Sequence, residues 1–194
     1  MQLLAIELSK DRLRRARNSL ASYNRATNFD EAHDAWTNFL VAASGVYAKL
    51  EQGSKVNNKS TDWFNRKKNE RRNDPMLQYL HQARNADEHG LLRVARNDLA
   101  EGFNKTLKFN ERVPIRVQPL SGDGKAPKGQ PMEAVIAGPS ARLVEVTNFG
   151  RMYAPPAEHL GKPLPYGLDF PDAVMQAAIV YLEALIAEAE ALVT

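Results

Sequence analysis

Apolar residues recur at three- and four-residue steps along the first part of the chain, which is the spacing of one face of an α-helix. The pattern predicts helices over residues 1–24 and about 30–52, with a break between them. Gly53 follows the second helix and is a suitable residue to end it. The second helix carries an apolar stripe formed by Ala32, Ala35, Trp36, Phe39, Leu40, Ala43, Val46, Tyr47 and Leu50. Both segments are therefore predicted to be core helices of a bundle.

Capping residues predict two shorter helices further along. The Ser-Thr-Asp segment at 60–62 is a suitable N-cap for a helix that runs to Arg72. Asp74-Pro75 is a stronger start signal, because the carboxylate can cap the helix and proline fits its first position. This fourth helix is predicted to run to about Asp87, with Gly90 at its end or at a kink.

The pattern changes after about residue 102. Apolar residues nearly alternate over 103–117, and residues 135–136 and 143–146 are also typical of strands, so we expect several short antiparallel strands. Residues 119–131 are rich in glycine, proline and lysine and predict an exposed loop. Residues 153–171 hold five prolines and predict an extended strap.

A long amphipathic helix is predicted at 171–193, opened by Pro171-Asp172. The predicted fold is therefore mainly α (α+β), a helical bundle with an inserted small antiparallel β region. We divide the chain into a helical core (1–102), a β-rich insertion with a proline-rich strap (103–170) and a C-terminal helix that completes the bundle (171–194). A two-stranded hairpin is unstable alone, so the strands must pack on the helices or on a partner.

Composition narrows the function only a little. The 194 residues include no cysteine, which excludes disulfides, thiolate metal sites and thiol nucleophiles. The formal net charge of +3 is too small to indicate nucleic-acid binding by itself. The N-terminal segment does not resemble a secretory signal, and no apolar stretch is long enough to span a bilayer. We therefore expect a cytoplasmic protein that does not act in a membrane.

The densest set of reactive side chains lies between Leu80 and Gly90. On a regular helix an arc of roughly 140° would contain His81, Arg84, Asn85, Glu88 and His89. An imidazole can transfer protons near neutral pH, and a guanidinium matches a phosphate with two parallel donors. Such a set suits attack by a ribose 2′-hydroxyl on the neighbouring phosphodiester, with His89 transferring the proton and Arg84 stabilising the charge. The pattern favours RNA as the substrate and requires no metal.

The motif Arg84-Asn85-x-x-x-His89 resembles the R-(polar)-x-x-x-H motif of HEPN domains, small helical bundles found in many prokaryotic toxins and defence ribonucleases. The resemblance covers about half of the chain and implies a HEPN-like bundle with the motif on one of its helices. It implies Arg84, Asn85 and His89 as the catalytic residues, with Asn85 orienting the imidazole. It also implies a homodimer whose two motifs face one cleft, and cleavage of RNA without a cofactor.

The predicted function is therefore a metal-independent endoribonuclease that acts as a toxin or phage-defence effector. RNA is its predicted substrate, and an antitoxin or another regulatory protein is a predicted partner. Two other interpretations stay open. The chain could be a non-catalytic HEPN-like module that binds RNA, a nucleotide or a protein. It could also be a structural or regulatory dimer whose β region is the interaction surface.

A basic run over residues 63–72 is the second candidate feature. Lys68, Arg71 and Arg72 share one predicted helix face and are candidates for binding the RNA backbone. His81 and Glu88 are further candidates for contact with the substrate. The alternative interpretation of the run is a solvated basic face. Its Trp63 is more typical of a core residue, although a tryptophan can also stack on a base.

The residues of the motif also have structural interpretations. Arg84 can pair with Asp87 or Glu88 on the helix surface, and His89 can cap the helix end. His33 lies beside Trp36 and is expected to be structural, and nothing in the sequence places His159 near the motif. A metal site would match no established ligand spacing if it were built from His81, Asp87, Glu88 and His89.

Overall fold

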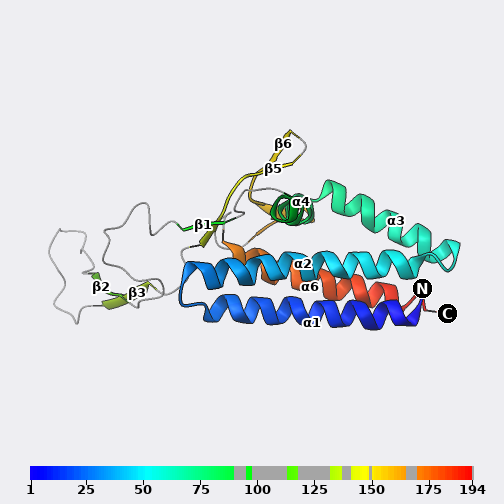
Figure 1. The fold of residues 1–194 in the computed structure, drawn as a ribbon, viewed down its shortest axis with the longest axis horizontal. Helices are drawn as coiled ribbons and strands as arrows, with labels where there is room; N and C mark the ends of the chain where they lie inside the picture. The colour runs from blue at the N-terminus through cyan, green and yellow to red at the C-terminus, as the bar shows by residue number, and fades with distance from the viewer. Residues whose placement is uncertain are drawn as a thin grey trace.

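A computed structural model describes residues 1–89, 95–97, 113–117, 132–136, 141–148, 150–164 and 170–193. Its helices are α1 (Leu3–Arg25), α2 (Phe29–Ser54), α3 (Asn58–Asn73), α4 (Pro75–His89) and α6 (Pro171–Glu190). The long helices α1, α2 and α6 lie side by side, while α3 follows the outer side of α2 and α4 crosses above them (Figure 1). Because α2 contacts each of the other four described helices, it is the centre of the fold.

The described strands form four two-stranded antiparallel sheets. The pairs are β1 (Ala95–Asn97) with β4 (Ala141–Leu143), β2 (Val113–Val117) with β3 (Met132–Ile136), β5 (Val146–Asn148) with β6 (Arg151–Tyr153), and β7 (Glu158–His159) with β8 (Lys162–Pro163). The prediction of a mainly helical chain with a small antiparallel β insertion is confirmed. The expected strands at 113–117 and 135–136 lie in β2 and β3, and the expected strand at 143–146 is divided between β4 and β5.

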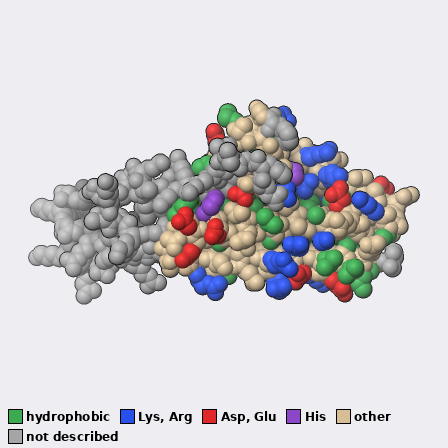
Figure 2. All heavy atoms as spheres, viewed as in Figure 1, with side chains coloured by type: hydrophobic (Ala, Val, Ile, Leu, Met, Phe, Trp, Pro, Cys, Tyr) green, Lys and Arg blue, Asp and Glu red, His purple; other side chains and the backbone are tan. Residues whose placement is uncertain are grey.

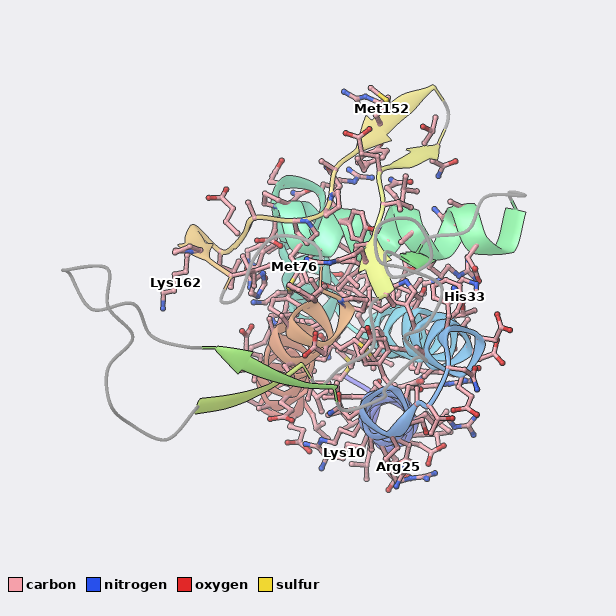
Figure 3. All side chains as sticks on the ribbon, turned by 90° about the vertical axis from the view of Figure 1, so that its left-hand side faces the viewer. Lys10, Arg25, His33, Met76, Met152 and Lys162 are labelled. Atoms are coloured by element: carbon pink, nitrogen blue, oxygen red, sulfur yellow. The ribbon has the colours of Figure 1, made fainter. Side chains whose placement is uncertain are left out.

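Several predicted features lie outside the described residues. They are the alternating segment 103–109, the loop 119–131, and Gly90 as the end of the fourth helix. The predicted strap is partly described: it contains the β7–β8 hairpin, which packs on α4. Figure 3 shows the β5–β6 and β7–β8 hairpins outside the helices. Met152 lies near the outer end of β5–β6, and Lys162 lies on β7–β8.

The core follows the predicted apolar stripe. Every residue of the stripe on α2 is buried, with Trp36 and Phe39 fully so. The final helix packs on α1 and α2 and ends at Glu190 rather than 193. The division of the chain into three parts stays a prediction. Among the described residues, none of the helices combines the length and the hydropathy that crossing a bilayer needs.

Two predicted helix boundaries are wrong. The third helix begins at Asn58 and is capped by Asn57, whose Oδ1 accepts a hydrogen bond from the Ser60 backbone N–H (2.8 Å), so the cap lies before the predicted segment 60–62. Gly53 does not end the second helix, which continues to Ser54. Gly53 instead lies against α1, where an added Cβ would lie 2.2 Å from the Cβ of Ala5.

Replacing Gly53 by alanine is expected to lower the free energy of unfolding by about 1–3 kcal/mol, the usual cost of overpacking. The Cβ of Ala5 is fixed to the α1 backbone, so the two helices would have to separate. Gly45→Ala is the matched control, because the atoms nearest to its added Cβ belong to the flexible side chain of Arg12. Alanine also favours helix over glycine by about 1 kcal/mol, so this variant should be neutral or stabilised. Urea denaturation of both variants is the check, and equal losses would contradict this role of Gly53.

Candidate functional site

Helix α4 is covered on two sides, and this determines which of its residues remain reachable. Its apolar residues Met76, Ala83 and Ala86 are buried in the core. A second side faces the insertion: the Tyr79 hydroxyl donates to the Val144 carbonyl oxygen (2.9 Å), and β5 packs along the helix. The predicted site residues His81, Arg84 and Asn85 lie between these sides and are half-buried.

Two basic side chains line one cavity, and the charge of a third acts on one of them. Arg71 of α3 and His81 of α4 line the same cavity of about 30 Å³, which has room for one or two water molecules. Burial, followed by the positive charges of Arg71 and Arg84, lowers the pKa of His81 below its usual 6.5. His81 is therefore neutral at pH 7. We call Arg71, His81 and Arg84 the basic cluster.

The rest of the cavity wall is mainly apolar and comes from α2, α4 and α6. It consists of Leu40, Ala43, Ser44, Tyr47, Leu77, Leu80, Ala178 and Leu182. Most of these side chains are buried in the core, which fixes α2, α4 and α6 against one another. Arg71 and His81 therefore form the basic part of an otherwise mainly apolar cavity wall.

Arg71 lies over an aromatic ring of α2. Its Cζ atom lies 4.5 Å from the centre of the Tyr47 ring. Among the residues whose side chains are described, none of the carboxylates lies within ion-pair distance of Arg71. An arginine stacked in this way keeps its donor edges available for an anion.

The motif itself is described in part. The Arg84 Nη1 atom donates to the Asn85 Oδ1 atom (3.3 Å), so the two predicted catalytic side chains are in contact. The Asp87 carboxylate accepts a weak hydrogen bond from Thr37 of α2 (3.4 Å). The side chains of Glu88 and His89 lie outside the described residues, so their roles stay predictions. The same holds for the alternative metal site, which needs both of them.

The lysines and arginines of the basic run have different neighbours. Lys68 lies 3.0 Å from the Glu51 carboxylate of α2, and Arg72 is exposed without joining the cavity. Lys67 pairs with Glu188 of α6 (2.8 Å). Figure 2 shows lysine and arginine side chains interspersed with acidic ones on the visible face. Of the run's three predicted substrate contacts, Arg71 alone lies in the basic cluster.

Trp63 is a core residue, which is the role that the sequence analysis favoured. Its side chain is buried, and the indole Nε1–H donates to the Glu188 carboxylate (3.0 Å). The ring is therefore not available to stack on a base in this conformation. His33 also has a structural contact, because its ring stacks on Phe29 with centroids 5.8 Å apart.

A second polar cluster lies at the N-terminal end of α4, and the sequence analysis did not predict it. Asp74 is buried, and its Oδ1 accepts the Leu77 backbone N–H (2.8 Å), which confirms the predicted helix cap. The same carboxylate contacts the His159 Nδ1 atom (3.0 Å) and accepts the Leu160 backbone N–H (2.6 Å). Burial raises the pKa of Asp74, but these hydrogen bonds outweigh it and hold that pKa below its usual 3.8. We call Asp74, His159 and Leu160 the clasp.

Two buried tyrosines lie between the clasp and the basic cluster. The Tyr47 hydroxyl donates to the Tyr181 hydroxyl (3.0 Å), which donates to the Glu70 carboxylate (2.7 Å). Burial raises the pKa of Tyr47 to about 12, and burial together with the neighbouring Tyr47 and Glu70 raises the pKa of Tyr181 further. Both hydroxyls are therefore neutral at physiological pH.

No family model, no curated protein and no solved structure matches this chain. The chemistry of its own side chains must therefore support any function assigned to it.

Proposed function

We propose that the chain is a metal-independent endoribonuclease of HEPN type and that its basic cluster binds the phosphate to be cleaved. The observation that carries the proposal is that Arg71 of α3 and His81 of α4 line one cavity, while the positive charges of Arg71 and Arg84 both act on His81. Two guanidinium groups can offer several N–H donors to the oxygens of one phosphate. The contact between Arg84 and Asn85 supports a shared role for these two residues of the motif.

In the proposed reaction a ribose 2′-hydroxyl attacks the adjacent phosphorus atom. The bond from phosphorus to the 5′-oxygen breaks, which leaves a 2′,3′-cyclic phosphate and a free 5′-hydroxyl. Arg71 and Arg84 stabilise the charge that builds on the non-bridging oxygens. His89 accepts the proton of the 2′-hydroxyl and delivers a proton to the departing 5′-oxygen, as the resemblance to HEPN domains implies. Asn85 orients the His89 ring. The homodimer, the toxin or phage-defence role, the regulatory partner and the cytoplasmic location rest on the sequence alone.

Cleavage of RNA in the presence of a chelator tests this function. Purified protein should cut a single-stranded RNA, leave 2′,3′-cyclic phosphate ends, and spare a DNA of the same sequence. Binding of RNA without cleavage would favour the non-catalytic module instead. Neither binding nor cleavage would exclude both functions and leave a structural or regulatory role.

The affinity for RNA is expected to rise as the pH falls from 8 to 5.5. Burial and then the charges of Arg71 and Arg84 lower the pKa of His81 and keep it neutral in the free protein. A bound phosphodiester would offset those charges, so binding would draw a proton onto His81. The affinity should increase by up to about tenfold per pH unit, the limit for one coupled proton.

Fluorescence anisotropy with a short RNA measures this effect. The RNA should carry a 2′-deoxy residue at the cleavage position and no terminal phosphate, so that its own charge stays constant. His81→Gln should remove most of the pH dependence, and His33→Gln should leave it intact. An affinity that does not change with pH in the unmodified protein would contradict the role of His81.

A further inference from the structure

We infer that the β7–β8 hairpin positions Arg71, through a chain of side-chain contacts that runs from His159 through Tyr181 and Tyr47. The inference rests on the proposed binding of phosphate by Arg71. It makes His159, Tyr181 and Tyr47 positioning residues, because none of them needs to touch the substrate. It also assigns a role to the last part of the insertion, which the proposed function leaves without one.

The hairpin is held in one place on the helices. Its turn places Leu160 (φ 49°) and Gly161 (φ 72°) in the left-handed region, which a leucine rarely adopts. The Asp74 carboxylate accepts the backbone N–H of this strained leucine (2.6 Å) and contacts the His159 ring at the same time. A buried carboxylate at the start of α4 therefore fixes the orientation of both hairpin residues.

His159 in turn restricts Tyr181. The two rings meet at nearly a right angle, with centroids 5.2 Å apart. The Tyr181 hydroxyl is fixed at its other end by Glu70 and Tyr47. A ring held at its edge and at its hydroxyl has little rotational freedom, so displacement of His159 would release one of the two constraints.

Tyr181 then restricts Tyr47, which carries Arg71. The Tyr47 hydroxyl donates to Tyr181, and the Phe64 ring packs against the Tyr47 ring at an angle of 69°. The Arg71 Cζ atom lies over the same ring. A long arginine side chain loses rotamer freedom when it binds a ligand, and stacking it beforehand reduces that loss. Phosphate affinity should therefore depend on the orientation of Tyr47.

The test measures two quantities in full-length His159→Ala. The first is the NMR resonance of the Arg71 side-chain Nε–Hε group, which the Tyr47 ring current shifts. The second is the affinity for the 2′-deoxy-substituted RNA described above. We expect the resonance to move toward its unstacked position and the affinity to fall about three- to tenfold, as expected when one side chain must be ordered on binding.

A double-mutant cycle separates positioning from a general loss of structure. In an Arg71→Ala background, His159→Ala should cause no further loss of affinity, whereas a general structural effect would lower affinity in both backgrounds. Tyr181→Phe removes the hydroxyl between Glu70 and Tyr47 and should reproduce both effects if His159→Ala does not fold. His33→Ala is the matched control, because His33 lies on the opposite side of the molecule from Lys162 of the hairpin (Figure 3).

An unchanged Arg71 resonance in His159→Ala would overturn the inference. So would an equal loss of affinity with and without Arg71. If the unmodified protein binds no RNA, the proposed function fails, but the resonance still decides whether the hairpin orients Arg71. The two failures are therefore distinguishable.

Discussion

Replacing Arg84 by alanine is expected to slow RNA cleavage at least about 100-fold, the usual cost of removing one donor to a developing negative charge. Arg84 is half-buried beside His81, so its charge acts where water is partly excluded. Arg84→Lys keeps the charge but loses the two parallel donors. Its cleavage rate should lie between those of Arg84→Ala and the unmodified protein. Initial rates on a fluorescently labelled RNA, with a chelator present, measure both effects.

Arg14→Ala is the control for this experiment. Arg14 is an exposed arginine on α1 that pairs with Asp11 on the same helix. Its removal changes the net charge by the same amount as the loss of Arg84 but should leave the cleavage rate unchanged. A rate for Arg84→Ala within twofold of the unmodified protein would contradict the assignment of Arg84.

Replacing Asp74 by alanine is expected to lower the free energy of unfolding by about 2–4 kcal/mol, because it removes a helix cap and leaves buried donors without an acceptor. The groups affected are the backbone N–H groups of Leu77 and Leu160 and the His159 ring. The same change should detach the β7–β8 hairpin from α4. Urea denaturation at pH 7 measures the loss.

The pH dependence of this loss follows from the low pKa of Asp74. The Asp74 carboxyl group has a lower pKa in the folded protein than in the unfolded chain, where its pKa is near the usual 3.8. It therefore contributes its full stabilisation of the fold at pH values above that unfolded-state pKa. That contribution disappears as the pH falls through the folded pKa. The difference between Asp74→Ala and the unmodified protein should therefore shrink at pH 3. Asp62→Ala, at an exposed position on α3, should cost little at either pH. A loss for Asp74→Ala that is equal at pH 7 and pH 3 would contradict this role.

Local sequence patterns were sufficient to predict most of the helices. Burial of an apolar stripe, as on α2, depends on spacing along one element, and the cap at Asp74 depends on adjacent residues. Gly53 was misread because its role depends on the approach of another helix, at Ala5. Nothing near Gly53 in the sequence records that approach.

The candidate site shows the same limit. The placement of Arg84 and His81 on one helix followed from their spacing. Lys68 and Arg71 share a helix face, but Lys68 meets a glutamate of α2 whereas Arg71 meets a tyrosine of the same helix. Their different roles depend on those neighbours. His159 is far from Asp74 in sequence, and the Leu160-Gly161 turn that brings them together carries no signal of its partner.

The proposed function depends on Arg71, His81 and Arg84 binding the same phosphate. The most direct test is an NMR titration of the protein with the 2′-deoxy-substituted RNA, following the side-chain resonances of all three residues. We expect the three sets of resonances to shift together and to give one dissociation constant. Three unrelated saturation curves, or shifts confined to other parts of the chain, would contradict a shared phosphate site.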